Sequence, residues 1–253
     1  MICIILCAGY GTRLYPYTIN APKALLDVSG KPLLSYTLEN LSEVEEIKKI
    51  LIVTNDKFYN DFIGWGNGNS KIEIINDETR TNETRLGGVM DFALVLEKFE
   101  NEDILILYGD NYFNFKLKAF VSFFNLNRKP TLALYDIKSS ERAKRFGVLE
   151  ISGNKIIKFE EKPANPKTTF ISTGCYLFPK ESIADLRAYI ESNKNKEGIG
   201  YIVKDFIEQG KEIQGFIFDA DWHDIGTIED YERIKREIEV LELKRKADSS
   251  NNL

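Results

Sequence analysis

The segment ICIILCAGYGTRL, residues 2–14, joins one wholly apolar run to a glycine-rich turn. The apolar run, Ile2–Cys7, has the length of a single β-strand and no polar residue on either face. Such a run is typical of a central strand in a parallel sheet, because helices cover both faces of that sheet. Gly9 and Gly11 then turn the chain where the strand ends. Ligands of open α/β sheets bind beyond the carboxyl ends of the strands, so we expect a binding loop here.

The same alternation continues through the first half of the chain. Further buried strands are predicted at residues 50–54 (ILIVT), 71–76 (KIEIIN) and 103–108 (DILILY). Helix-like segments lie between them, at residues 32–41, 58–63 and 89–99. This βαβαβαβ order indicates a parallel sheet with right-handed crossovers and helices on both faces.

The second half has strand-like runs that are separated by short turns. Strands are predicted at residues 131–137, 146–151, 155–160, 170–178 and 212–219, and helices at roughly 180–193, 200–209 and 229–246. Short turns between strands favour antiparallel or mixed pairing. No repeat and no linker rich in proline or glycine divides the chain, so we expect a single domain.

Composition and charge exclude several classes of protein. The 253 residues carry 34 Lys and Arg against 39 Asp and Glu, which gives a net charge of −5. A mildly acidic surface argues against a protein that coats nucleic acid or anionic lipid. No apolar run reaches the ~18–20 residues of a membrane span, and the first residues lack the basic segment of a signal peptide. We therefore expect a cytoplasmic protein that binds neither nucleic acid nor membrane.

The rare residues limit the chemistry further. His223 is the only histidine, which excludes a metal site built from several histidines of one chain. We interpret His223 as a residue that packs or orients its turn rather than as a catalytic base. The cysteines, Cys3, Cys7 and Cys175, form no CxxC pair and are interpreted as core residues.

The loop after the first strand brings cations to a glycine turn. A Gly-x-Gly turn frees backbone N–H groups to face an anion, and Arg13 and Lys23 add two positive charges. The loop is not a dinucleotide fingerprint, because Leu14 stands where the third glycine belongs, and no Walker A sequence occurs. Alone, the glycines would form an ordinary turn beside a solvated arginine. Together with the two cations, they suit a triphosphate.

Two carboxylates follow strands elsewhere in the chain. Asp110 follows DILILY after a single glycine, and Asp224 lies in WHDIGT (222–227), which we expect to be a turn after a strand. Either one alone is an ordinary turn residue. Together they would complete a site for Mg²⁺, which takes one or two protein carboxylates plus substrate phosphates.

The second half contains candidates for binding a phosphorylated sugar. Glu161 and Lys162 stand at the end of a predicted strand, where a lysine beside a glutamate can hold a phosphate and a sugar hydroxyl together. The alternative is a charged run on the surface. Gly147 and Gly174 place glycine inside predicted strands, which marks either a close approach of a ligand or a β-bulge.

In combination, these pieces resemble the nucleotidyltransferase family that makes nucleotide sugars. This family includes glucose-1-phosphate thymidylyltransferases, mannose-1-phosphate guanylyltransferases and UDP-sugar pyrophosphorylases. The residues that carry the resemblance occur in family order across nearly the whole chain: LCAGYGTRLYPYT (6–18), APKALL (21–26), GDN (109–111), FGV (146–148), EEKP (160–163), STG (172–174) and WHDIGT (222–227).

The resemblance implies a fold and a division of the chain. The fold is a Rossmann-like α/β fold, in which a mixed, mostly parallel central sheet is flanked by helices and joined to a smaller antiparallel sugar-binding part. One nucleotidyltransferase domain would cover residues 1–246. Its nucleotide-binding half is expected at about 1–125, its sugar-phosphate-binding half at about 126–227 and its C-terminal helix at about 228–246, followed by a flexible tail, 247–253.

The resemblance also implies a reaction in which an NTP and a sugar 1-phosphate give an NDP-sugar and pyrophosphate, with Mg²⁺ as cofactor. By position, the nucleotide-binding residues are Leu6, Ala8, Gly9, Tyr10, Gly11, Thr12, Arg13, Lys23, Gly87, Gly88 and Asp110. The sugar-phosphate-binding residues are Asn111, Gly147, Glu161, Lys162, Thr173 and Gly174. Catalysis is assigned to Arg13, Lys23, Asp110, Lys162 and Asp224, and the metal to Asp110 and Asp224.

A reaction of this kind needs no protein nucleophile. An oxygen of the sugar phosphate attacks the α-phosphorus in line, and pyrophosphate leaves. No general base is required, because a phosphate monoester is already anionic at neutral pH. Catalysis then consists of aligning two anions and neutralising their charge.

One segment departs from the thymidylyltransferases of this family, which read thymine with a glutamine. The corresponding segment here is NETRLGG (82–88), and the only glutamines, Gln209 and Gln214, lie far downstream. We expect backbone groups of residues 86–88 to read the base, whose identity stays open. The β-helix or helical extension of many relatives is missing as well, so the chain is expected to be a monomer or a homo-oligomer without contacts from those parts.

Three alternative functions stay open. A cytidylyltransferase would use choline phosphate or inositol phosphate as the acceptor. A metal-dependent glycosyltransferase would use the DxD string at residues 219–221, although a diphosphate donor needs no triphosphate loop. A sensor of nucleotide or sugar phosphate would bind without turnover, but such a domain is expected to lose the charged site residues.

Overall fold

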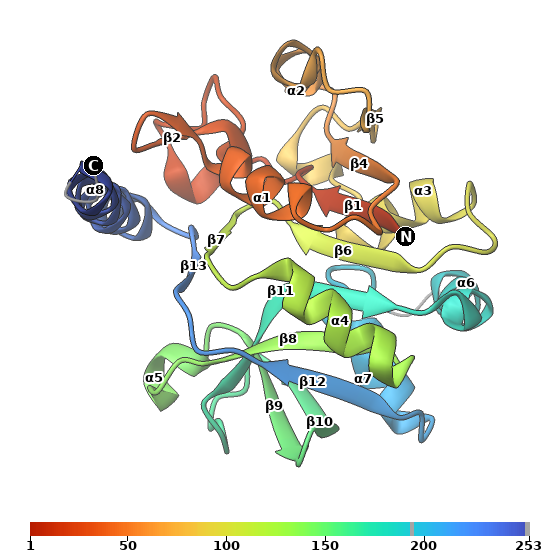
Figure 1. Cartoon of the computed structure of the whole chain (residues 1–253). Helices are drawn as coiled ribbons and strands as arrows, with labels where there is room; N and C mark the ends of the chain where they lie inside the picture. Colours follow the sequence, from red (N-terminus) through yellow and green to blue (C-terminus); the bar gives the residue numbers. More distant parts are fainter. Residues whose placement is uncertain (193–194, 251–253) are drawn as a thin grey trace.

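The computed structural model describes residues 1–192 and 195–250. A sheet of nine strands runs through the molecule in the order β5-β4-β1-β6-β11-β8-β12-β10-β9 (Figure 1). Its first four strands are parallel and match the apolar runs of the first half: β5 (Ile72–Asn76), β4 (Lys49–Thr54), β1 (Ile2–Leu6) and β6 (Ile104–Tyr108). β1 lies between β4 and β6, with Ile2 level with both Lys49 and Ile104.

The remaining strands form the mixed part of the sheet, in the lower half of Figure 1. They are β11 (Phe170–Phe178), β8 (Thr131–Asp136), β12 (Ile213–Ile217), β10 (Lys155–Glu161) and β9 (Gly147–Ser152). β11 is antiparallel to both β6 and β8, and so it joins the two halves, while β12 is parallel to β8. The predicted Rossmann-like mixed α/β fold is confirmed.

Successive side chains of β1 point to opposite faces of the sheet. Cys3 and Ile5 belong to the hydrophobic core on one face, beneath α1 (Leu33–Ser42), α2 (Tyr59–Gly66) and α4 (Leu117–Asn127). Ile2 and Ile4 belong to the core on the other face, beneath α3 (Gly88–Leu96), α6 (Ile183–Glu191) and α7 (Gly200–Glu208). Two cores on one strand explain why its sequence is apolar without alternation.

The structure adds elements that the sequence patterns did not predict. The longest of them, α4, carries a clear helical period, with buried side chains at Leu117, Phe120, Val121 and Phe124. The other additions are short: β2 (Asp27–Val28), β3 (Lys31–Pro32), β7 (Asn111–Phe113), β13 (Trp222–Asp224), α5 (Ser140–Ala143) and the 3₁₀ helices η1 (Thr12–Leu14), η2 (Lys23–Leu25), η3 (Asn82–Thr84) and η4 (Lys180–Ser182).

The predicted turn around Asp224 is wrong. Asp224 ends β13, which pairs in antiparallel fashion with β7, so that Asp224 lies opposite Asn111. Strands of three residues are too short to show a period in the sequence, and this pair exists only because segments far apart in the chain meet.

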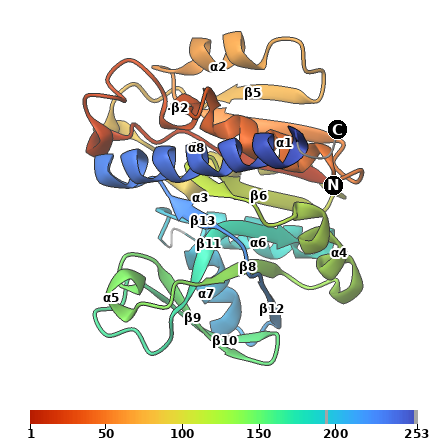
Figure 2. The same cartoon turned by 60° about the vertical axis from the view of Figure 1, so that its left-hand side comes forward.

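The C-terminal helix, α8 (Ile228–Ser250), crosses the outside of the parallel half (Figure 2). Tyr231, Ile234 and Ile238 are buried in a third core with residues that include Leu14 and Leu26, so α8 holds the segment that contains Lys23. The helix extends past the predicted end at residue 246. Residues 251–253 of the predicted tail, and residue 193 of a predicted helix, lie outside the described residues. None of the described helices combines the length and apolar composition that a membrane crossing requires.

Candidate active site

Two adjoining cavities open at the carboxyl ends of β1 and β6. The smaller has a volume of about 470 Å³, and the larger about 810 Å³. Arg13, Tyr108, Asp110 and Glu197 line both of them. The smaller cavity gathers every predicted nucleotide-binding residue: Leu6, Ala8, Gly9, Tyr10, Gly11, Thr12, Arg13, Lys23, Gly87, Gly88 and Asp110. The larger gathers every predicted sugar-phosphate-binding residue: Asn111, Gly147, Glu161, Lys162, Thr173 and Gly174.

The loop that follows β1 presents backbone donors to the smaller cavity. Gly11 adopts a left-handed conformation, with φ +62°, immediately before η1. Its carbonyl oxygen accepts hydrogen bonds from the Leu14 N–H, at 2.8 Å, and from the Thr18 hydroxyl, at 2.7 Å. In the described part of the chain, no protein acceptor bonds the backbone N–H groups of Gly9, Tyr10 and Gly11. Free N–H groups in a glycine turn form a concave site for an anion.

Two side chains hold this loop from behind. The Asn55 side-chain amide donates to the Ala8 carbonyl oxygen at 2.9 Å. The Tyr10 side chain is buried, and its hydroxyl lies 3.0 Å from the Thr79 hydroxyl. Tyr10 therefore contributes its backbone to the cavity surface and uses its ring to fix the loop.

Lys23 and Asp110 form the best-defined ion pair of the site. Lys23 Nζ donates to Asp110 Oδ2 at 2.8 Å, and the lysine side chain is only 11% exposed. η2 places Lys23, while Asp110 follows β6 directly. The pair stands at the boundary of the two cavities, because Asp110 lines both.

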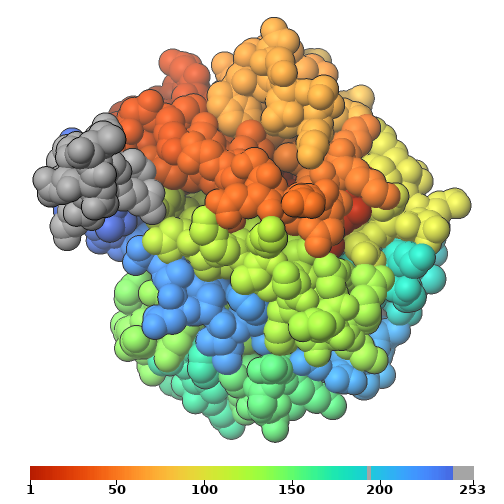
Figure 3. All heavy atoms as spheres, in the orientation of Figure 1, coloured from red at the N-terminus to blue at the C-terminus, as the bar shows by residue number. Residues whose placement is uncertain are grey.

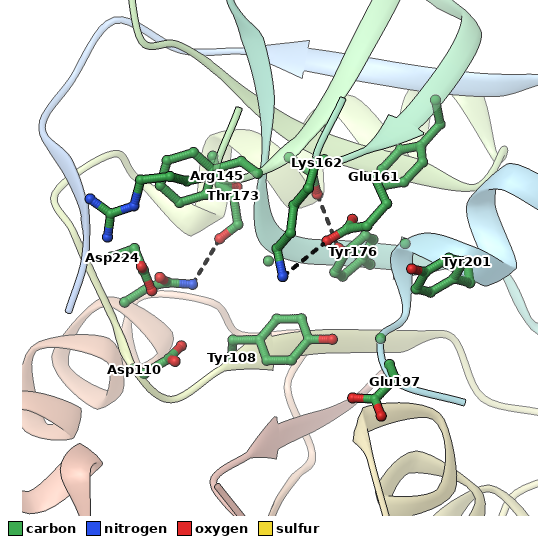
Figure 4. Close-up of a pocket in the computed structure, with 18 of the residues that line it drawn as sticks. Tyr108, Asp110, Arg145, Glu161, Lys162, Thr173, Tyr176, Glu197, Tyr201 and Asp224 are labelled. Carbon is green, nitrogen blue, oxygen red and sulfur yellow. Dashed lines mark hydrogen bonds and ion pairs between the residues drawn. The ribbon is translucent and has the colours of Figure 1, made fainter. Parts of the chain in front are cut away.

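Asp224 completes a carboxylate pair with Asp110. β13 places Asp224 beside the start of β7, and Figure 4 shows both carboxylates facing the same space. Burial, and then the negative charge of Asp110, raise the pKa of Asp224 to about 6, while Lys23 acts in the opposite direction. The described residues include no group of three or more His, Cys, Asp and Glu side chains that could hold a metal ion. The donor set of two carboxylates fits Mg²⁺, which takes its other ligands from phosphates and water.

Lys162 and Glu161 stand at the end of β10, across the larger cavity. Lys162 has a φ of +46°, and its N–H donates to the Phe146 carbonyl oxygen at 3.0 Å. Its ammonium is directed into the cavity above Tyr108 and lies 3.6 Å from Glu161 Oε1 (Figure 4). Burial raises the pKa of Glu161, and Lys162 partly offsets this effect. The larger cavity thus has a cation facing the carboxylate pair.

Three predicted sugar-phosphate residues are engaged in holding the protein together. The Asn111 side-chain amide donates to the Thr173 carbonyl oxygen at 2.9 Å, and the Thr173 hydroxyl donates to the Ala133 carbonyl oxygen at 2.8 Å. Gly174 lies in a β-bulge of β11 with φ +77°, where a Cβ atom would meet Tyr108 Cδ2 at 2.6 Å. Glycine here is required by neighbouring protein atoms, whatever the cavity binds.

The backbone at the start of α3 is less available than the sequence suggested. The Gly88 N–H donates to the Glu197 carbonyl oxygen at 3.1 Å. Gly87, with φ +88°, lies so close to the Lys196 carbonyl oxygen that a Cβ atom would approach it to 2.7 Å. A loop of the second half therefore occupies the Gly88 N–H, and the expectation that backbone groups of residues 86–88 read the base stays a prediction for the other groups.

The structure also brings residues to the larger cavity that sequence reasoning missed. They are Tyr108, Lys144, Arg145, Phe146, Phe159, Ser172, Tyr176, Glu197, Gly198, Gly200, Tyr201 and Trp222. Arg145 lies on the same side of the cavity as Asp224 and donates to Asp230 of α8 at 2.9 Å (Figure 4). Phe146, Ser172 and Trp222 belong to motifs quoted above, although no site role was predicted for them. No local motif indicates the other residues, because they come from separate elements.

His223 lies outside both cavities, and the three cysteines are buried. His223 lines neither of the two cavities and lies 3.5 Å from Glu237 of α8. Cys3, Cys7 and Cys175 are buried free thiols. Cys7 does line the smaller cavity, but burial raises the pKa of its thiol far above the ordinary value. A buried thiol of this kind is inert.

Comparisons with known proteins show the family of the chain. The family described as "Nucleotidyl transferase" matches residues 2–240. The chain is 28% identical to the bifunctional protein GlmU of Methanocaldococcus jannaschii over 89% of this chain and 51% of the relative. It is 30% identical to a "Putative mannose-1-phosphate guanyltransferase" of Sulfolobus acidocaldarius over 94% and 63%, respectively. The chain thus spans about half to two thirds of these relatives.

A solved structure shows the same fold over almost the whole chain. It is a crystal structure of a "Putative Glucose-1-Phosphate Thymidylyltransferase" from Bacillus anthracis in complex with a sucrose. The two structures superpose with a TM-score of 0.81 at 25% sequence identity, and the match covers 94% of this chain and 96% of the other. With the family match over residues 2–240, this places the chain in the nucleotidyl transferase family.

Proposed function

We propose that this chain transfers a nucleotidyl group from an NTP to a sugar 1-phosphate and releases pyrophosphate. The observation that carries the proposal is the junction of two cavities at Asp110 and Asp224. The smaller cavity offers free backbone N–H groups, Arg13 and Lys23 to a triphosphate. The larger offers Lys162 to a second phosphate. Two related proteins named for mannose 1-phosphate and glucose 1-phosphate support a sugar phosphate as the acceptor.

The reaction balances without a protein nucleophile. A phosphate oxygen of the acceptor forms a bond to the α-phosphorus, and the bond from that phosphorus to the bridging oxygen of pyrophosphate breaks. The acceptor is already anionic, so no proton has to be removed. The main barrier is the repulsion between two polyanions, and the role of the protein is to align and neutralise them.

Each charged residue has a distinct part in that alignment. Arg13 and the loop N–H groups hold the β- and γ-phosphates, because a rigid fork and backbone donors match phosphate oxygens. Lys23, close to the boundary of the cavities, neutralises charge on the transferring group. Lys162 holds the acceptor phosphate in line.

A divalent cation, which we take to be Mg²⁺, would be held by Asp110 and Asp224. Such an ion supplies charge neutralisation on the phosphates when bound. The buried carboxylate pair supports this assignment, because Lys23 alone offsets only part of its charge.

The experiment is a substrate grid. Pyrophosphate release is measured with Mg²⁺ for ATP, CTP, GTP, UTP and dTTP, each against several sugar 1-phosphates, choline phosphate and inositol phosphate. One pair should give turnover that Asp110→Asn lowers by at least ~10²-fold, the usual cost of a lost transition-state contact. Activity with a non-sugar phosphate alone would favour the cytidylyltransferase. If the protein is folded and binds nucleotide but releases no pyrophosphate with any pair of substrates, the proposal is contradicted.

A further inference from the structure

The nucleoside must lie at one definite end of the smaller cavity. Its phosphate end is given by Gly9–Arg13, Lys23 and Asp110. The α-phosphate has to stand at Asp110, where the cavities meet, and the triphosphate extends along the loop from there. We expect the base to face the part of the remaining wall that includes Leu6, Asn82, Arg85, Gly87, Gly88 and Asp91.

Asp91 is a buried carboxyl group on this wall. It lies in the first turn of α3, lines the cavity and is only 6% exposed. Its Oδ1 is buried, and the described part of the chain supplies no N–H or hydroxyl donor to it. A buried polar atom of this kind is costly unless something compensates it.

The compensating group inside the protein is a second carboxyl. Asp77, after β5, uses its Oδ1 to accept the N–H and the hydroxyl of Thr79, at 2.7 and 2.8 Å. Its Oδ2, like Asp91 Oδ1, is buried without such a donor. Burial, and then the negative charge of Asp77, raise the pKa of Asp91 to about 7, and burial raises the pKa of Asp77 as well. Two carboxyl groups that share a buried site do not both ionise readily, so the pair is expected to carry about one negative charge.

In the described part of the chain, no ion pair joins Asp91 or Asp77 to a Lys or Arg side chain. Arg85, the basic residue on this wall, has other partners: one guanidinium nitrogen lies 3.5 Å from Glu197 Oε2, and another donates to the Asn82 carbonyl oxygen at 3.1 Å. Asp77 raises the pKa of Asp91, and Asp91 in turn raises the pKa of Cys7, Tyr10 and Tyr108, so these electrostatic neighbours are acidic. The base end of the cavity is thus an acceptor surface that carries negative charge.

We propose that Asp91 selects a nucleobase with an exocyclic amino group, that is cytosine, adenine or guanine, over uracil and thymine. An amino group donates to the carboxyl pair and relieves its charge. Uracil and thymine present carbonyl oxygens on both sides of a single N–H, and a carbonyl facing a carboxylate is repelled. This inference rests on the proposed function, because it takes the smaller cavity as the NTP site. Asp91 would then recognise the base in a chain that has no glutamine in segment 82–88.

Substitutions of the two aspartates separate this role from a structural one. In Asp91→Asn, the amide keeps the shape but removes the charge, and it can turn either a donor or an acceptor toward the base. In Asp77→Asn, the amide Oδ1 keeps both bonds to Thr79, and its NH₂ donates to Asp91, which then holds the charge itself. The first variant should lose base selection, and the second should keep it.

The experiment measures binding, without an acceptor, so that it does not depend on turnover. Dissociation constants of ATP, CTP, GTP, UTP and dTTP with Mg²⁺ are obtained by calorimetry for the natural chain, Asp91→Asn, Asp77→Asn and the control Asp61→Asn, an exposed residue of α2. We expect at least one amino-bearing nucleotide to bind ~10-fold or more tightly than both UTP and dTTP. Asp91→Asn should reduce this ratio of dissociation constants to less than ~3-fold. The amide can accept a hydrogen bond from an amino group or donate one to a carbonyl group, and so it binds both kinds of base similarly.

Several results would overturn the inference. Tightest binding of UTP or dTTP would do so, and so would an unchanged ratio in Asp91→Asn. Loss of selection in Asp77→Asn and Asp61→Asn alike would point to general damage and would also overturn it. If no nucleotide binds, this inference and the proposed function fall together. If binding shows the expected ratio but the substrate grid releases no pyrophosphate, only the proposed function fails.

Discussion

Lys162 is the residue whose position most directly implies contact with an acceptor phosphate. Its side chain is 66% exposed and carries its ammonium into the larger cavity, with Glu161 as its ion-pair partner. Lys162→Ala should lower kcat/KM for the acceptor by at least ~10²-fold, because a charge is lost where two anions must meet. The control is Lys158→Ala on the same strand, since Lys158 pairs with Glu160 and lines neither cavity. Equal kinetics for the two variants would contradict the role of Lys162.

The raised pKa of Asp91 predicts that the free energy of unfolding depends on pH. Its pKa is raised to about 7 in the folded state by burial and by Asp77, so the folded chain keeps a proton that the unfolded chain loses above pH ~4. The stabilisation from that proton is complete below pH ~4 and is lost as the pH rises to about 7. Asn cannot titrate. The stability of Asp91→Asn relative to the natural chain should therefore rise over this range, by on the order of 2–4 kcal/mol.

The measurement is urea unfolding of both proteins at several pH values between about 5 and 8. Asp61→Asn serves as the control, because that exposed carboxyl should give a difference that is small and flat with pH. A flat difference for Asp91→Asn as well would show that Asp91 does not hold the proton.

At the scale of elements, the bulge in β11 fixes the wall between the cavities. Gly174 has φ +77°, and an added Cβ would lie 2.6 Å from Tyr108 Cδ2 and 2.8 Å from Asn111 Nδ2. Gly174→Ala should cost the left-handed strain of ~1 kcal/mol plus ~1–3 kcal/mol for the overlap. Gly153→Ala is the matched control, since Gly153 has φ +58° with nothing within 4 Å of an added Cβ. Equal losses of unfolding free energy in the two variants would contradict this packing.

An element could be predicted from the sequence when its own residues determine it, and could not when a residue distant in sequence determines it. β1 and β6 were predictable because helices bury both of their faces, and that burial leaves a continuous apolar run. The bulge at Gly174 was one of two interpretations of a glycine in a strand, and the sequence could not choose between them. Glycine is needed at this position because Tyr108 lies against it, and Tyr108 lies there only because β6 and β11 pair.

At the scale of the whole molecule, the antiparallel joint between β6 and β11 sets the two cavities side by side. The motif residues of the first half gather in the smaller cavity, and those of the second half gather in the larger (Figure 3 shows one face of the assembled halves). Charged motifs that end strands could be predicted to meet, because strand ends share one edge of the sheet. Tyr108, Arg145 and the Asp77–Asp91 pair could not, since their roles arise from burial and from neighbours distant in sequence.

The central claim is that an NTP and an acceptor phosphate lie in adjoining cavities and react directly, with no covalent intermediate on the protein. The most direct test is the stereochemical course at phosphorus, measured with an NTP that carries sulfur at the α-phosphorus in one configuration. A single in-line displacement predicts inversion of configuration in the nucleotide product. Retention would mean two displacements through a nucleotidyl-protein intermediate, and would contradict the account.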